Sequence, residues 1–113
     1  MTKLFGLKNC DGCKKAMKAL DAAGIAYDFV DIRAEADLPA RLPLWLDKAG
    51  AKALVNTRST TWRGLDEVQR ARAESDPAGL LAENPTLIKR PVVETGEQVF
   101  AGWSDKVLAA CQP

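Results

Sequence analysis

Residues 3–32, KLFGLKNCDGCKKAMKALDAAGIAYDFVDI, show three successive patterns of apolar residues. Residues 3–7 form a short apolar run of the kind found in buried strands. Over residues 13–23 the apolar positions recur at helical spacing with lysines on the other face, and Gly24 supplies a stop signal. Residues 25–32 then alternate as in a second strand. The stretch predicts strand, helix, strand, and a crossover helix makes the two strands a parallel, right-handed pair.

Residues 33–84 differ in composition: they are rich in alanine, leucine and charged residues and contain few runs of β-branched residues. We expect three helices in this stretch, over about 43–49, 65–73 and 76–83. Pro43 and Gly50 mark the two ends of the first, and Asp76 followed by Pro77 starts the third. This part of the chain is therefore predicted to be an all-helical insertion.

The last part of the chain predicts a hairpin and a final helix. The runs TLIKRPVVE (86–94) and EQVFAG (97–102) flank a turn at Thr95-Gly96, and Ser104 is placed to cap a helix that contains Cys111. The order is β-α-β, helical insertion, β-β-α. It predicts an α/β protein with a thioredoxin-like fold, as a single domain over residues 1–113 with an insertion over about 33–84.

The composition and the net charge of the chain indicate which classes of binding partner to expect. A chain of 113 residues suffices for one core, and 16 Lys and Arg against 15 Asp and Glu leave a net charge of +1. We therefore expect neither nucleic acid nor a membrane as the partner. The first residues have no apolar core of a signal peptide and no apolar run reaches membrane-span length, so we expect the cytoplasm. In that reducing compartment a close cysteine pair is more often catalytic, redox-sensing or metal-binding than a permanent disulfide.

Cys10 and Cys13 form a CxxC pair at the predicted start of the first helix. Free amide groups at a helix N-terminus stabilise a thiolate, neighbouring lysines act in the same direction, and Asp11 opposes them. We expect the pKa of Cys10 to lie below that of a free thiol. Two intervening residues also let the sulfurs approach, so that Cys10 can attack a substrate and Cys13 can resolve the mixed disulfide.

Two other interpretations of this pair stay open. A structural zinc site needs four ligands, and the chain has no histidine and one further cysteine, Cys111, so no metal is predicted. Alternatively, Cys13 simply packs on the apolar face of the helix, with Cys10 as an isolated thiol. Cys111 is expected to be a core residue of the last helix.

Three segments together resemble the ArsC-related family, which includes arsenate reductases, Spx regulators and YffB-type thiol reductases. They are LFGLKNCDGCKKAMKALDAAGIAYDFVDIR (4–33), LVNTRSTTWRGL (54–65) and LIKRPVVE (87–94). The likeness is nearest to the YffB-type branch. It implies a thioredoxin-like fold with a helical insertion, Cys10 as the nucleophile, and Cys13 in the position of a resolving thiol.

The same resemblance implies a set of site residues. Arg90 joins the two cysteines as a catalytic group that stabilises the thiolate, and the Arg90-Pro91 bond is expected to be cis and to face Cys10. The residues implied to bind substrate are Lys8, Asn9, Arg58, Arg63 and Pro91. Arsenate reductases have a further arginine just after the final strand, where this chain has Gly102 and Trp103, and that absence weakens the case for arsenate.

Structural roles are the alternatives for the charged and aromatic residues. Lys89 and Arg90 can be a solvated strand end, and Arg58 and Arg63 a solvated loop. Thr60 and Thr61 are expected to cap a following helix. Trp62 and Trp103 are expected to pack rather than to line a groove.

The expected function is a small thiol-disulfide oxidoreductase with glutathione as co-substrate, acting as a monomer on a small thiol or disulfide, with no bound cofactor and no metal. One alternative is an Spx-like redox-sensing regulator that binds RNA polymerase. A true arsenate reductase and a noncatalytic binding module are the others.

Overall fold

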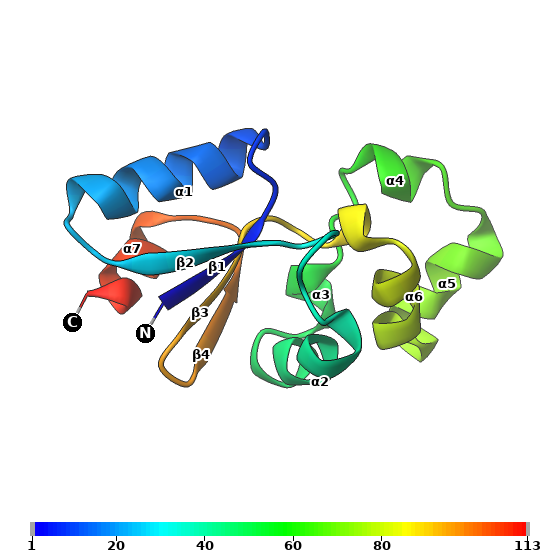
Figure 1. Ribbon diagram of the computed structural model, residues 1–113. Helices are drawn as coiled ribbons and strands as arrows, with labels where there is room; N and C mark the ends of the chain where they lie inside the picture. Colours follow the sequence, from blue (N-terminus) through cyan, green and yellow to red (C-terminus); the bar gives the residue numbers. More distant parts are fainter. Residues whose placement is uncertain (1, 113) are drawn as a thin grey trace. The chain divides into compact units, whose positions relative to one another are not determined.

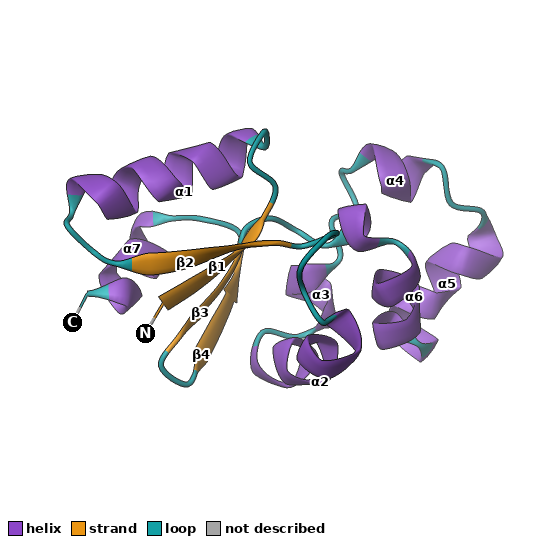
Figure 2. Ribbon diagram, viewed as in Figure 1, coloured by secondary structure: helices purple, strands orange, loops and turns teal. Residues whose placement is uncertain are grey.

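The computed structural model describes residues 2–112, which form two compact units (Figure 1). The first contains the chain up to Ala36 and from Arg90 onward, and the second is Asp37–Lys89. The named strands all belong to the first unit, whereas the second is built from helices and turns (Figure 2). Among the described residues, no helix combines the length and the apolar character needed to cross a bilayer.

Four strands form the sheet of the first unit in the order β2-β1-β3-β4. The central strand β1 (Thr2–Gly6) pairs in parallel with β2 (Tyr27–Asp31) and antiparallel with β3 (Val92–Thr95), and β3 pairs antiparallel with β4 (Gln98–Ala101). The predicted parallel pair is confirmed. With helices α1 and α7 the order is β-α-β and then β-β-α, which confirms the predicted thioredoxin-like α/β fold.

The hairpin turn lies one residue later than predicted. Thr95 is still part of β3 and pairs with Gln98, so the turn consists of Gly96 and Glu97. Gly96 has a φ of 58°, a left-handed conformation in which a residue without a Cβ is favoured. Gly96 thus correctly indicated a turn, but the pairing of Thr95 with Gln98 determines at which residue the turn begins.

Helices α1 (Asp11–Ala22) and α7 (Asp105–Cys111) contact each other, and residues of both join those of the sheet in one apolar cluster. The buried members of this cluster are Leu4, Ala16, Leu20, Val93, Val107 and Cys111. The placement of Cys111 in the core confirms the prediction. Ser104 caps α7 as predicted, because its hydroxyl accepts a hydrogen bond from the amide of Val107.

The second unit contains five helices and a 3-10 turn. They are α2 (Leu38–Lys48), α3 (Ala51–Leu54), α4 (Thr60–Arg63), α5 (Glu67–Ser75), α6 (Pro77–Glu83) and η1 (Pro85–Leu87). The helix predicted from Asp76 and Pro77 is confirmed. The Asp76 side chain accepts from the amide of Gly79 at 3.1 Å.

The predicted start of the first helix in this unit was wrong. The helix begins at Leu38, capped by Asp37, and Pro43 lies inside it. A proline inside a helix removes one hydrogen bond and crowds the preceding turn. Leu38, Leu42 and Trp45 share one buried face of α2, and burying that face outweighs the local cost of Pro43.

The prediction that Thr60 and Thr61 cap a following helix was also wrong. Both residues lie within the short helix α4, and Ser59 is the cap, with its hydroxyl 3.1 Å from the amide of Trp62. The Thr61 hydroxyl instead shares a 2.7 Å hydrogen bond with the hydroxyl of Thr86, which ties α4 to η1.

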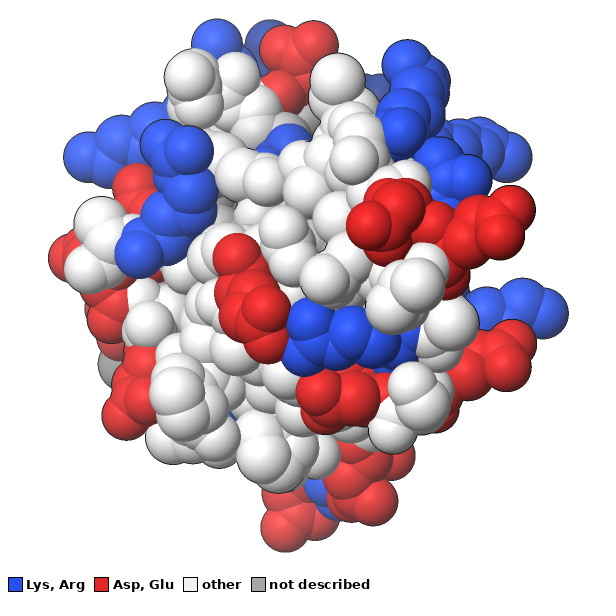
Figure 3. Space-filling model, turned by 90° about the vertical axis from the view of Figure 1, so that its right-hand side faces the viewer, with Lys and Arg blue, Asp and Glu red and all other residues white. Residues whose placement is uncertain are grey.

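Charged side chains of both signs are intermingled on the face shown in Figure 3. A group of charged side chains of both signs also joins α5 to α6, where the Arg72 guanidinium lies 2.6 Å from a carboxylate oxygen of Glu83 and 3.0 Å from one of Asp76. These contacts are exposed to solvent, so each adds little to stability.

We predict that Leu4→Ala lowers the free energy of unfolding by about 2–5 kcal/mol, because it opens a cavity in the core beside α1. Leu4 is fully buried at the centre of β1 and pairs with Phe29 and Val93. The measurement is urea denaturation followed by circular dichroism. Val68→Ala is the control, since Val68 is 75% exposed and its loss should change stability by less than about 0.5 kcal/mol. Equal midpoints for the two variants would contradict this description of the core.

Candidate thiol site

Cys10 is the N-cap residue of α1, at the end of the loop that leaves β1. Its backbone is extended, its amide donates to the carbonyl of Leu7 at 3.1 Å, and its carbonyl accepts from the amide of Lys14 at 2.9 Å. The side chain is half-buried. The sulfur therefore lies where the unpaired amides of the first helical turn point, as the sequence predicted.

The surroundings of Cys10 lower the pKa of its thiol. Burial alone would raise this pKa, but hydrogen bonds from the backbone amide of Cys13, from the Arg90 side chain and from the Cys13 thiol, together with the charge of Arg90, outweigh burial. The predicted direction of the shift is confirmed. The family resemblance implied Arg90 as a cation that stabilises the thiolate, and Arg90 is among the causes of the lowered pKa. The neighbouring lysines, which the local sequence also suggested, are exposed to solvent, which screens their charge.

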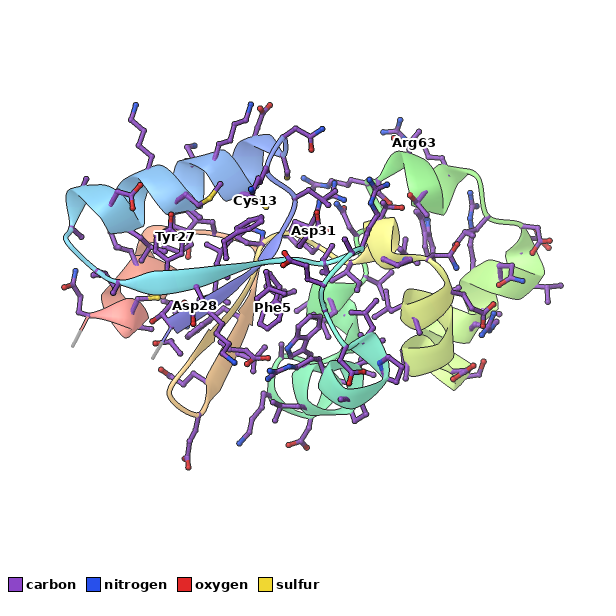
Figure 4. All side chains as sticks on the ribbon, viewed as in Figure 1. Phe5, Cys13, Tyr27, Asp28, Asp31 and Arg63 are labelled. Atoms are coloured by element: carbon purple, nitrogen blue, oxygen red, sulfur yellow. The ribbon has the colours of Figure 1, made fainter. Side chains whose placement is uncertain are left out.

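Cys13 has the opposite environment. Its side chain has no exposed surface, and Figure 4 shows it on the side of α1 that faces the sheet. Burial raises the pKa of its thiol to about 11, although a hydrogen bond from the backbone amide of Leu7 acts in the other direction, and the neighbouring Cys10 raises it further. Both cysteines are free in this structure. Cys10 is thus the more readily ionised thiol of the pair, and Cys13 keeps its proton to a higher pH.

Arg90 reaches the site because the first turn of α1 packs directly against the Arg90-Pro91 segment. A Cβ placed on Gly12 would lie 3.3 Å from the carbonyl oxygen of Arg90 and 3.9 Å from Cδ of Pro91. The Arg90-Pro91 peptide bond is cis, which confirms the expectation from the family resemblance. Pro91 itself is buried and directly precedes β3.

The segment after β4 contacts Pro91 through its backbone and offers the site no positively charged side chain. The amide of Gly102 donates to the carbonyl of Pro91 at 2.8 Å, and Gly102 has a φ of 88°, where a side chain would be strained. Trp103 packs against the apolar cluster of the first unit, as predicted. Neither residue can provide the guanidinium that arsenate reductases have after the final strand.

The remaining predicted site residues lie in two places. Lys8 and Asn9 are exposed in the loop between β1 and α1. Arg58 and Arg63 belong to the second unit, both exposed, and the Arg63 guanidinium donates to the Arg58 carbonyl at 3.3 Å. Figure 4 shows Arg63 at the outer side of α4. The substrate-binding role of all four stays a prediction.

Two contributors to the site were not singled out from the sequence. They are the backbone amide of Leu7 and the residue before it, Gly6, which contacts the sulfur of Cys13. An isolated glycine in a predicted strand is a known signal of close approach, so Gly6 could have been found. Within residues 2–112, no cluster of His, Cys, Asp and Glu is placed to hold a metal ion.

Comparisons with known proteins place the chain in a family. The model of the ArsC family matches residues 5–111. An uncharacterized protein of Haemophilus influenzae is 39% identical over 111 residues, which cover 97% of each chain. A solved structure of a YffB protein is 36% identical with a TM-score of 0.88 over 100% of both chains. The global transcriptional regulator Spx of Streptococcus mutans is 24% identical over 100% of this chain and 84% of its own. Because the family model covers nearly the whole chain, this protein belongs to the ArsC family.

Proposed function

We propose that the protein is a small thiol-disulfide reductase linked to glutathione, with Cys10 as its nucleophile. One observation carries the proposal: a half-buried thiol at the N-terminus of α1 has its pKa lowered by an amide, a guanidinium and a second thiol. A thiolate is the reactive form of cysteine, so this arrangement suits attack on a disulfide. Membership of the ArsC family supports a reductase.

The proposed reaction has two steps. The Cys10 thiolate attacks one sulfur of a substrate disulfide, which forms a Cys10 mixed disulfide and releases the other sulfur as a thiolate that takes a proton from water. In the second step, the Cys13 thiol gives its proton to water and the resulting thiolate attacks the Cys10 sulfur. This forms the Cys10-Cys13 disulfide and releases the bound sulfur as a thiolate, which takes a proton from water. Alternatively, the thiolate of glutathione attacks the mixed disulfide and restores the Cys10 thiolate directly.

The other residues have binding roles in this proposal. Arg90 stabilises the Cys10 thiolate and pairs with a carboxylate of glutathione, since guanidinium groups bind carboxylates through paired hydrogen bonds. Pro91 presents its backbone to the substrate, and Lys8, Asn9, Arg58 and Arg63 bind its anionic groups. The protein acts as a monomer and needs no bound cofactor. Arsenate is disfavoured because Gly102 and Trp103 offer no third cation to a tetrahedral oxyanion.

An Spx-like regulator is the second candidate, favoured by the similarity to Spx over the whole chain. In that case the two cysteines act as a switch, and the output is binding to RNA polymerase. A regulator would retain polymerase from a cell lysate and would show no turnover in a glutathione-coupled disulfide assay. Turnover without retained polymerase supports the reductase.

We predict that alkylation of Cys10 by iodoacetamide follows a pH titration with a midpoint below 9.0, the ordinary value for a thiol. Arg90→Gln removes both a hydrogen bond and a positive charge that favour the thiolate, so the midpoint should rise. At pH 7 the alkylation rate should fall about three- to tenfold, because each pKa unit changes the thiolate fraction about tenfold.

Lys89→Gln is the matched control for this titration, since Lys89 is the exposed neighbouring cation. It should leave the Cys10 midpoint within the error of the measurement. A midpoint at or above 9.0 in the unaltered protein, or equal effects of the two substitutions, would contradict the proposed role of Arg90.

We also predict the products of a reaction with oxidised glutathione, identified by mass spectrometry after alkylation of the free thiols. The unaltered protein should form the Cys10-Cys13 disulfide, and Cys13→Ser should accumulate a glutathione adduct at Cys10. Cys10→Ser should form neither product and should lose turnover in the coupled assay. Cys111 is the internal control, since it is buried in the core and should stay reduced in all three proteins. Turnover that survives in Cys10→Ser would refute the proposed reaction.

A further inference from the structure

Gly6, the last residue of β1, provides the space that the sulfur of Cys13 occupies. A Cβ built on Gly6 would collide with Sγ of Cys13. Its next neighbours would be Cβ of Cys13 at 3.5 Å and a methyl group of Leu4 at 3.9 Å, both at ordinary van der Waals distance. The sulfur is therefore the one atom that a Cβ at position 6 would meet at less than ordinary van der Waals distance.

The backbone gives no other reason for a glycine at this position. Gly6 is not among the glycines with positive φ, which are Gly24, Gly50, Gly96 and Gly102. It is a regular strand residue that pairs with Asp31, and its carbonyl accepts from the amide of Ile32 at 2.9 Å. A glycine weakens a strand because it has no side chain to pack and more backbone freedom to lose. What the glycine provides here is room for one thiol.

That room determines what the thiol can touch. The sulfur of Cys13 lies against the backbone of Gly6, receives a hydrogen bond from the amide of Leu7, and donates to the sulfur of Cys10. The side chain has no exposed surface, so a disulfide in solution cannot approach it in line.

We propose that Gly6 is a positioning residue that fits the Cys13 thiol into the backbone of β1 and leaves Cys10 as the one sulfur with which Cys13 forms a disulfide. This inference rests on the proposed thiol-disulfide reaction. A soluble disulfide enters only at Cys10, and Cys13 then attacks the Cys10 sulfur from inside the protein. The pair loses two electrons as the substrate disulfide gains them, and the substrate leaves as two thiols.

A double-mutant cycle tests the steric part. Gly6→Ala should lower Tm by roughly 5–15 °C in the chain with Cys13, since overpacking of a full core is costly. In the Cys13→Ala background the same substitution should lower Tm by less than about 3 °C, because the colliding atom is gone. Gly64→Ala is the control, since a Cβ there meets its nearest atoms at 3.6 and 3.7 Å. Equal effects of Gly6→Ala in both backgrounds would overturn the proposal.

The proposal that Cys13 reacts only with Cys10 needs a measurement that does not depend on the stability of the protein. The native proteins are treated with oxidised glutathione or iodoacetamide, and each modified cysteine is identified by mass spectrometry. With Gly6 present, iodoacetamide should label Cys10 and not Cys13, and oxidised glutathione should give the Cys10-Cys13 disulfide with no adduct at Cys13. In Gly6→Ala, the displaced Cys13 should become labelled and the share of internal disulfide should fall at least severalfold. Unchanged protection of Cys13 in a folded Gly6→Ala variant would overturn the proposal.

The outcomes separate the two proposals. If Gly6→Ala fails to fold whereas Gly6→Ala with Cys13→Ala folds, the steric fit is supported directly. A non-additive cycle in a protein whose Cys10 does not react with oxidised glutathione would overturn the proposed function and leave the steric fit in place.

Discussion

The site depends on the antiparallel pairing of β1 with β3. Phe5 pairs with Val92, so the end of β1 that leads to Cys10 lies beside the start of β3, which follows Arg90 and Pro91. Segments about eighty positions apart in the chain thus meet at one end of the sheet. Without this register Cys10 would still be the N-cap of α1, but it would lack the guanidinium that favours its ionisation.

The two cysteines are about one helical turn apart, yet their pKa values are shifted in opposite directions. Cys10 lies at the N-cap, where amides and a cation outweigh burial. Cys13 lies three residues later on the apolar face, where burial dominates and raises the pKa of the thiol to about 11. The CxxC spacing therefore places one thiol at the N-cap beside Arg90, where it ionises more readily, and the other on the buried face, where it keeps its proton to a higher pH.

Much of this arrangement could be predicted from the sequence, because its signals are local. The periodicity of residues 3–32 predicts β1, α1 and β2, and the CxxC pair at the start of a helix predicts the direction of the Cys10 shift. The sequence-based predictions failed, or missed a residue, where the local structure depends on packing between residues that are distant in the chain. Burial of one face of α2 overrides Pro43, and the contacts of Gly6 and Leu7 with Cys13 exist only once α1 lies on β1.

The second unit, Asp37–Lys89, is a continuous segment that separates Cys10 from Arg90 in the chain. A ribosome synthesises the chain from its N-terminus, so β1 and α1 emerge long before β3. Until the helical segment has been completed and β3 has joined the sheet, Cys10 has no guanidinium beside it. During most of its synthesis the newly made chain therefore lacks the guanidinium that helps to lower the pKa of Cys10 in the folded protein.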